Sequence, residues 1–431
     1  MKNLLPDLLP RLEKKRINGL DAGPRAFYPY YDGYSLANLP ASVCHWLGVP
    51  PFGSAPLGPE ILNLWEGGFR QVVVLVVDGL GLNFVQEALH LGPDDDLGAS
   101  WRAITQDAVL SPLTSIVPST TAAALTSLWT GVPAAEHGVL AYEVWLKEYG
   151  LIANMILHAP AAYLGEVGSL AKAGFKPETF LPVPTLGPHL RKYGVRTCAI
   201  QHHLIAHSGL SRMLFPGVDV VPFRTQSDLW VTLGRLMDEE SQEPRYLYMY
   251  WGDLDDVMHR FGPEDERARW EFTSFSRQLA QFLKKRRAAG RGDTLLLLTA
   301  DHGHNATPRS PHNEINRYPQ LLDCLVMPPS CENRLPVVFL RPGKEKQFRQ
   351  IVEKTWPGVF HLLPSEDAVR AGLFGARVYE RFWSRVGDYV LVPQTDEAYW
   401  WFYAGRDNLL LGRHGGMSRR EMLTPLVGMQ I

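Results

Sequence analysis

The sequence predicts an α/β protein in which helices cover a central, mostly parallel sheet. Four short, strongly apolar runs support this prediction, at residues 71–77, 195–200, 245–251 and 294–300. Runs that are apolar on both faces are typical of buried parallel strands, and the long intervals between them leave room for crossover helices. Acidic residues follow three of the runs, including Asp78, Asp255 and Asp301. Because such sheets bind ligands at the carboxyl ends of their strands, we expect a site there.

A small α+β insertion is predicted between residues 330 and 408. It contains two strand-like and two helix-like segments, at 335–343, 344–356, 365–375 and 387–393. Residues 1–329 and 409–431 would then form the core domain, because the segment 414–427 returns the chain to the expected site. A helix is also expected from about residue 263 to the run KKRR at 284–287, whose charges suit a helix C-terminus better than a nucleic-acid patch.

Composition limits the classes of partner. The net charge of -2 and the pI near 6.7 over 431 residues give no field that would gather nucleic acid or an acidic membrane. The longest strongly apolar run, 72–77, is far shorter than the ~20 residues of a membrane span. Pro6, Asp7 and Pro10 interrupt the apolar N-terminus, so we expect no signal peptide and a cytoplasmic location. The four cysteines form no CxxC pair and are expected to be reduced.

A hydroxyl cluster precedes an alanine-rich segment that should be helical. Ser119, Thr120 and Thr121 follow Pro118 there. The unpaired N–H groups and the dipole of a helix N-terminus favour a phosphoryl oxygen. Simple N-capping by Ser119 or Thr120 is the alternative, and both roles are compatible because one hydroxyl can cap while its neighbour faces a substrate. The sequence has no Ser-His-Asp signature, so a metal ion is the expected activator of a hydroxyl nucleophile.

Candidate metal ligands occur in several further segments. If a helix follows residue 251, Asp255 and His259 lie at i and i+4 on one face. Asp301 and His302 end an apolar strand, where burial is costly unless they are paired or metal-bound. Taken alone, Asp78 suits a turn, the Asp255 pair suits a helix surface, and His414, before two glycines, suits a solvent-facing loop. Oxygen and imidazole ligands without cysteine are typical of catalytic zinc or manganese.

These segments, in this order, resemble the alkaline phosphatase superfamily, and within it the type I phosphodiesterase/nucleotide pyrophosphatase family. The resemblance covers about residues 70 to 427. The matching motifs are a strand-end Asp, Pro-Ser-x-Thr, Asp-x-x-x-His with Gly-Pro, Asp-His-Gly and a late His-Gly, here Asp78, Pro118–Thr121, Asp255–His259 with Gly262-Pro263, Asp301–Gly303 and His414-Gly415. The resemblance implies an alkaline-phosphatase-like sandwich and a hydrolase that cleaves phosphodiester or pyrophosphate bonds.

The resemblance also implies the site residues. Thr121 would be the nucleophile, with Thr120 as the second choice, and would form a phospho-threonine ester that water then hydrolyses. One zinc would bind Asp78, Thr121, Asp301 and His302, and another would bind Asp255, His259 and His414. His304 has no role in this pattern, and His137 is expected to be structural. The substrate would be a small phosphate ester or a nucleotide.

The chain departs from the family at one position. Many nucleotide pyrophosphatases carry Pro-Asn after the nucleophile, where Ala123 and Ala124 stand here, so backbone N–H groups would have to replace the amide donor. A phosphomonoesterase and a phosphomutase of the phosphoglycerate type are the alternative activities. A sulfatase is disfavoured because the segment lacks Cys/Ser-x-Pro-x-Arg, and a non-enzymatic binding module is disfavoured because Asp or His fills every ligand position.

Overall fold

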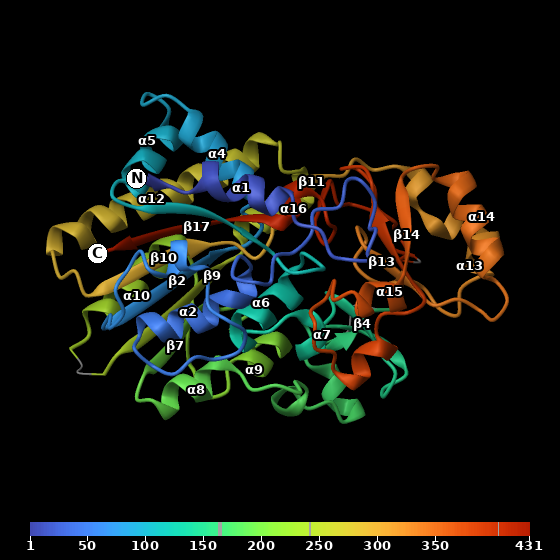
Figure 1. The fold of residues 1–431 in the computed structure, drawn as a ribbon, viewed down its shortest axis with the longest axis horizontal. Coiled ribbons are helices and arrows are strands. Elements are labelled where there is room, and N and C mark those ends of the chain that lie inside the picture. The colour runs from blue at the N-terminus through green and yellow to red at the C-terminus, as the bar shows by residue number, and fades with distance from the viewer. Residues whose placement is uncertain (163–165, 241–242, 404) are drawn as a thin grey trace.

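An eight-stranded sheet forms the centre of the protein (Figure 1). The computed structural model describes the whole chain apart from residues 163–165, 241–242 and 404. In spatial order the strands are β1 (Lys2–Asn3), β3 (Val109–Thr114), β17 (Leu423–Gln430), β10 (Thr294–Thr299), β2 (Gln71–Val77), β9 (Arg245–Trp251), β7 (Arg196–His202) and β8 (Asp219–Phe223).

The four predicted strands are confirmed, as β2, β7, β9 and β10. They are parallel, and with β8 they form five consecutive parallel strands in the order β10-β2-β9-β7-β8. All seven residues of β2 are buried, and so are all seven of β9 and all six of β10. Burial on both faces explains why these strands appear in the sequence as continuous apolar runs rather than as alternating patterns. The predicted mostly parallel sheet is therefore present.

Helices pack on both faces of this sheet. Figure 1 shows α1 (Leu5–Glu13), α4 (Leu82–His90), α5 (Asp96–Thr105) and α12 (Glu266–Ala289) on one face, and α2 (Leu39–Trp46), α6 (Thr121–Thr130), α8 (Leu186–Lys192) and α9 (Gly209–Leu214) on the other. The other helices are α3 (Pro59–Leu62), α7 (Ala134–His137), α10 (Gln226–Asp238), α11 (Asp253–Phe261), α13 (Pro319–Leu322), α14 (Glu345–Thr355), α15 (Ser365–Arg370) and α16 (Arg419–Met422). The predicted run KKRR lies in the last turns of α12.

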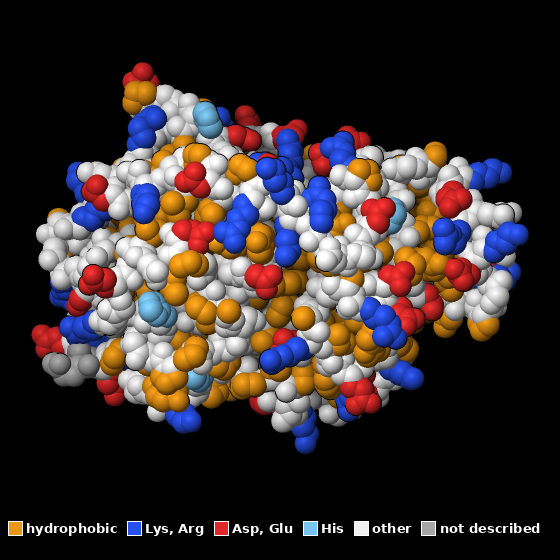
Figure 2. Space-filling view, in the orientation of Figure 1, with side chains coloured by type: hydrophobic (Ala, Val, Ile, Leu, Met, Phe, Trp, Pro, Cys, Tyr) orange, Lys and Arg blue, Asp and Glu red, His pale blue; other side chains and the backbone are white. Residues whose placement is uncertain are grey.

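None of the helices in the described ranges has the length and apolar character needed to cross a membrane. Figure 2 shows basic and acidic side chains mixed over one face of the molecule, in agreement with the near-neutral net charge.

A second sheet lies beside the first. Its strands, in spatial order, are β14 (Phe360–Pro364), β15 (Tyr389–Pro393), β13 (Pro336–Val338), β12 (Ser330–Cys331), β4 (Glu143–Leu146), β5 (Leu151–Asn154) and β6 (Ala159–Pro160). A separate hydrophobic cluster around Trp356 and Trp400 packs on it. Strands from residues 330–408 and strands from residues 143–160 thus belong to the same sheet. The domain boundary of the insertion at 330 and 408 stays a prediction.

Four strands of the central sheet, β1, β3, β8 and β17, did not stand out in the sequence. Strand β17 lies antiparallel between β3 and β10, and its sequence, LTPLVGMQ, is interrupted by Pro425 and Gly428. Gly428 allows close packing, because a Cβ atom there would lie 2.3 Å from the ring of Trp65. The short helix α16 leads into β17 and thereby carries the segment after His414 into the sheet.

A buried ion pair joins the two sheets. Arg334, between β12 and β13, donates from Nε and Nη2 to the two carboxylate oxygens of Glu421 in α16, over 3.0 and 2.9 Å. Neither side chain is exposed. Glu421 also accepts hydrogen bonds from the N–H groups of Gly416 and Ser418 and from the amide of Asn305. The pair therefore fixes the loop that follows His414 against the second sheet.

Replacement of Glu421 by Gln should destabilise the protein by about 3–5 kcal/mol, because it leaves the Arg334 guanidinium buried without its counter-charge. Urea unfolding at pH 7 measures this free energy. The matched control is Glu366→Gln in the exposed pair with Arg370, which should cost less than about 1 kcal/mol. Equal effects of the two substitutions would contradict the stabilising role of the buried pair.

The effect of Glu421→Gln should also depend on pH. Burial opposes ionisation of Glu421, but Arg334 and the hydrogen-bond donors outweigh it and lower the pKa of this carboxyl below 4.5. A carboxyl with a lowered pKa in the folded state stabilises the fold above its unfolded pKa, and this contribution is lost as the pH falls through the folded value. The difference in unfolding free energy between wild type and variant should hence be constant from neutral pH to about 5 and shrink below 4.5.

Candidate active site

Three buried carboxylates meet at the ends of three neighbouring strands. Asp301 follows β10, Asp78 follows β2, and Asp255 lies in α11 directly after β9. Their relative exposures are 0%, 3% and 9%. Because the strands are parallel and adjacent, their carboxyl ends share one edge of the sheet, which is where the sequence predicted a site.

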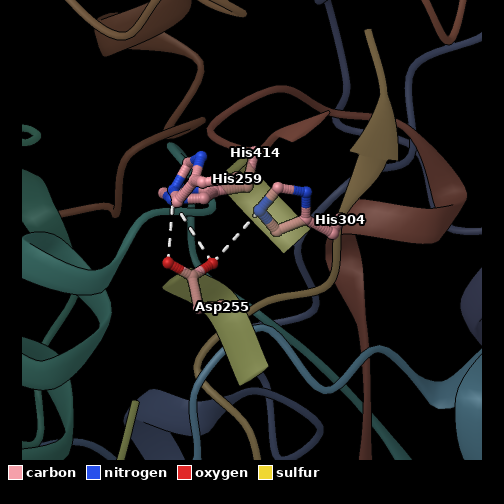
Figure 3. Close-up of side chains that lie close together, drawn as sticks. All are labelled: Asp255, His259, His304 and His414. Carbon is pink, nitrogen blue, oxygen red and sulfur yellow. Dashed lines mark ion pairs between the residues drawn. The ribbon is translucent and has the colours of Figure 1, made fainter. Parts of the chain in front are cut away.

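Asp255 lies among three imidazoles (Figure 3). Its Oδ2 atom is 3.2 Å from His259 Nε2, and its Oδ1 atom is 3.1 Å from His304 Nε2 and 4.0 Å from His414 Nε2. The predicted i and i+4 arrangement of Asp255 and His259 on one helix face is present, because both lie in α11. The Nδ1 atoms of His259 and His414 face the carbonyl oxygens of Gly412 and Ser119 at 3.0 and 3.2 Å. Such carbonyl contacts orient the opposite ring nitrogen towards a metal.

A second group of ligand atoms surrounds His302. Its Nε2 atom lies 3.3 Å from Asp78 Oδ1 and 3.5 Å from Asp301 Oδ2. The ring of His302 stacks on that of His414, with 3.7 Å between centroids, so the two groups adjoin. Asp301 Oδ1 accepts hydrogen bonds from the N–H groups of Gly79 and His302, which directs Oδ2 towards the imidazole.

Gly303 allows the backbone after His302 to pass close to two other backbone segments. A Cβ atom at this position would lie 2.0 Å from the carbonyl oxygen of Arg420 and 2.9 Å from the Cα of Gly81. The Asp-His-Gly motif therefore ends in glycine because the chain after His302 passes directly against two other backbone segments.

Several ligand atoms of this cluster have no hydrogen-bond partner in the part of the chain that the structure describes: Asp78 Oδ1, Asp255 Oδ1, Asp301 Oδ2 and both ring nitrogens of His304. Burial, with the charges of Asp301 and Asp255, raises the pKa of Asp78 well above its usual value. Unpaired buried carboxylates and imidazoles are costly, whereas bound cations would neutralise and coordinate them. The donor set of oxygens and imidazole nitrogens suits divalent cations.

The ligand atoms form two groups of cation-binding size. Within each group, one ligand atom from every residue lies within 4.8 Å of the others: Asp255, His259, His304 and His414 in one, and Asp78, Asp255 and His302 in the other. Asp255 belongs to both groups, so the two adjoin and can share this carboxylate. The cluster therefore fits the divalent cations that its chemistry requires.

Thr121 is the hydroxyl residue that faces this cluster. It is the first residue of α6, and its Oγ1 atom lies 3.1 Å from His302 Nε2 and 3.5 Å from Asp78 Oδ2. The first hydrogen bond of the helix runs from the N–H of Ala124 to the carbonyl of Thr120, and no side chain caps the helix start. The preceding N–H groups, including that of Ala123, are thus free of intrahelical partners at this end.

The neighbouring hydroxyls point elsewhere. Thr120 Oγ1 donates to Glu332 Oε1 over 2.6 Å, and Ser119 Oγ donates to the carbonyl of Gly416 over 2.8 Å. N-capping by Ser119 or Thr120, one of the two predicted roles, is therefore wrong, because both hydroxyls serve tertiary contacts. Thr120, the second choice as nucleophile, also faces away from the ligand atoms.

All seven sequence-predicted site residues lie in this one cluster: Asp78, Thr121, Asp255, His259, Asp301, His302 and His414. His137 lies outside it, buried, with its ring nitrogens at Ser127 Oγ and the N–H of Val139, which is the structural role predicted.

The sequence prediction missed two residues that contact the cluster, His304 and Tyr250, and one, Glu332, that contacts the neighbouring Thr120. His304 joins the Asp255 group, and its position two residues after His302 was the available signal. Tyr250, near the end of β9, donates its hydroxyl to Asp78 Oδ2, but the apolar run around it hid this polar role. Glu332 comes from the second sheet, where burial raises its pKa to about 7, and nothing near it in the sequence indicated a contact with Thr120.

Comparisons with solved structures show the same fold. Ectonucleotide pyrophosphatase/phosphodiesterase 5 from mouse superposes with a TM-score of 0.61 at 17% identity, over 83% of this chain and 87% of the mouse chain. Phosphonoacetate hydrolase from Sinorhizobium meliloti 1021 gives 0.58 at 19% identity, over 84% of this chain and 90% of the bacterial chain. No curated protein sequence matches the chain.

The family model described as type I phosphodiesterase / nucleotide pyrophosphatase matches residues 72–417. This span begins in β2 and ends beyond His414, so it contains every residue of the cluster described above. The chain belongs to the type I phosphodiesterase/nucleotide pyrophosphatase family and is a hydrolase of that family.

Proposed function

We propose that this protein hydrolyses phosphodiester or pyrophosphate bonds in small phosphate esters or nucleotides through a phospho-threonine intermediate at a two-zinc site. The observation that carries the proposal is the position of Thr121 Oγ1, 3.1 Å from His302 Nε2 and 3.5 Å from Asp78 Oδ2, at the start of α6. A cation held by these ligand atoms would activate the Thr121 hydroxyl as a nucleophile.

Two sets of residues would hold the cations. By the family resemblance, one set would be Asp78, Thr121, Asp301 and His302, and the other would be Asp255, His259 and His414. The ligand atoms of the second set lie within 4.8 Å of one another, and Asp301 Oδ2 lies 3.5 Å from His302 Nε2 in the first. Zinc fits the imidazole and carboxylate donors, and manganese is the alternative. When bound, two such cations polarise the phosphoryl group and stabilise both the attacking and the leaving oxygen of an in-line displacement.

The residues of the chain would act in two displacements. In the first, Thr121 Oγ1 would form a bond to phosphorus as the bond to the leaving oxygen breaks, and the hydroxyl proton would end on that leaving oxygen. In the second, a water oxygen attacks the same phosphorus and releases Thr121 with its proton. The free N–H groups at the start of α6 would stabilise the phosphoryl oxygens. They would thereby replace the Asn amide donor that is missing where Ala123 and Ala124 stand.

The relatives indicate which substrates to test first. One structure of the mouse phosphodiesterase is described as a complex with AMP, which favours nucleotide diesters and pyrophosphates. The bacterial relative is named as a phosphonoacetate hydrolase, which makes phosphonates a useful comparison. Phosphomonoesters are the near alternative, because the same two displacements cleave them with a different leaving group. The cytoplasm remains the predicted location.

Substitution of Thr121 by Ala should lower the hydrolysis of bis-p-nitrophenyl phosphate by roughly 10³-fold or more, because the attacking oxygen is lost. The folded protein should still bind two equivalents of zinc. Thr120→Val is the matched control, since it removes an adjacent threonine hydroxyl that contacts Glu332, and it should retain far more activity. Wild-type turnover by the alanine variant would exclude Thr121 as the nucleophile.

Substitution of His414 by Ala should remove one zinc selectively. His414 Nε2 belongs to the Asp255 group, and the ring of His414 also stacks on His302. After dialysis against a mild chelator, the zinc content measured by elemental analysis should fall from two equivalents per chain to about one, and turnover should fall with it. Unchanged stoichiometry and rate would show that the late His-Gly motif does not bind metal.

A further inference from the structure

His304 is a deeply buried imidazole of the candidate site. It is 1% exposed, and neither ring nitrogen has a hydrogen-bond partner among the described residues. Its Nε2 atom lies 3.1 Å from Asp255 Oδ1, without the geometry of a hydrogen bond. A buried imidazole that forms no hydrogen bond is costly, so its environment requires an explanation.

The ring of His304 is positioned among the other imidazoles of the Asp255 group. Its centroid lies 4.7 Å from that of His259 and 5.5 Å from that of His414. Figure 3 shows all three rings around the Asp255 carboxylate. In a tetrahedral zinc site with bonds of about 2.0–2.1 Å, neighbouring ligand atoms lie about 3.3–3.4 Å apart. The contact of Asp255 Oδ1 with His304 Nε2, at 3.1 Å, is close to that separation, and His414 Nε2 lies 4.0 Å from the same oxygen. His259 Nε2 faces the other oxygen, Oδ2, at 3.2 Å.

Backbone structure holds His304 in this place. Strand β11 (Asn305–Ala306) pairs with β16 (Gly412–Arg413), so the residue before β11 lies beside the residue after β16, which is His414. Gly412 leaves room for the ring, because a Cβ atom there would lie 2.9 Å from His304 Nδ1 and 2.3 Å from the carbonyl oxygen of Met258. The same ladder thus positions two imidazoles together.

We propose that His304 is a fourth protein ligand, through Nε2, of the cation held by Asp255, His259 and His414. This inference rests on the proposed function only in requiring a cation at that group. Three imidazoles and one carboxylate would give this cation four protein ligands, and contact with a substrate oxygen would then use the five-coordinate state that catalytic zinc sites can adopt.

The two cation sites of this protein would then differ in chemistry. The Asp255 group offers three nitrogens and one shared carboxylate, which favours zinc over manganese or magnesium. The Thr121 group offers oxygens from Asp78, Asp301 and Thr121 with the single imidazole of His302, and it retains the harder donors that manganese accepts. His304 is in this view a residue that sets metal selectivity at one site.

Zinc binding by the full-length His304→Ala variant tests the inference. Titration of the metal-free protein with zinc against a chromophoric chelator should show two sites in wild type. In the variant, the zinc affinity of one site should fall about 100-fold or more, because removal of even an outer-shell partner can cost up to about 100-fold. The zinc affinity of the other site should not change. Cobalt substitution gives a second readout, because an intense tetrahedral visible spectrum in wild type should weaken when one ligand is removed.

Two control variants make the result specific. His158→Ala removes another buried imidazole, whose ring nitrogens have no hydrogen-bond partner among the residues that the structure describes and which packs against Phe175. It should leave both zinc affinities unchanged. Thr121→Ala should abolish turnover while the Asp255 group still binds zinc. If His304→Ala fails to fold, His304→Gln keeps most of the volume and should show the same selective loss.

The outcomes separate this inference from the proposed function. Two zinc sites of unchanged affinity and an unchanged cobalt spectrum in the His304 variant would overturn the inference and leave the proposed function intact. A wild-type protein that binds no zinc at the Asp255 group would overturn both. Selective weakening of one site with an altered cobalt spectrum would establish His304 as a ligand.

Discussion

Three buried carboxylates at one edge of the central sheet dominate the organisation of this protein. Asp78, Asp255 and Asp301 lie at the ends of adjacent parallel strands, where their negative charges cannot be separated and water cannot reach them freely. Burial, together with the charges of Asp301 and Asp255, favours the neutral form of Asp78. Asp255 differs from Asp78, because facing imidazoles outweigh its burial and hold its pKa well below the usual value. Cations bound at this edge of the sheet would neutralise the negative charge that the three carboxylates bring together.

The same constraint explains how much of the structure the sequence reveals. A strand that is buried on both faces must be continuously apolar, so β2, β9 and β10 are visible as runs, and the carboxylates stand out where each run ends. Asp255 and His259 are recognisable because helical spacing places them together. Strand β17 is hidden because Pro425 and Gly428 interrupt its pattern, although it lies within the sheet. The local sequence pattern therefore predicts those metal-ligand candidates that directly follow a buried strand or share one face of a helix.

Residues whose role depends on distant contacts are invisible to such patterns. Local pattern alone does not separate the three consecutive hydroxyls from Ser119 to Thr121. The family resemblance selected Thr121, and in the structure each hydroxyl has a different partner. Tyr250 occupies an apolar strand like its neighbours, yet its hydroxyl reaches Asp78. Glu332 comes from a different sheet, more than two hundred positions away from Thr120. For these residues the information lies in the packing of one segment against another.

The second sheet is therefore part of how the site is built. Glu332 Oε1 accepts hydrogen bonds from Thr120 Oγ1 and from the N–H of Tyr142, which ties the start of α6 to a loop beside β4. Gly415 passes so close to the same residue that a Cβ atom would lie 2.5 Å from Glu332 Cγ. Glu332 thus touches both the segment that carries Thr121 and the segment that carries His414. Sequence changes between residues 330 and 408 can alter the positions of the hydroxyl and the imidazole together, because a single buried side chain connects them.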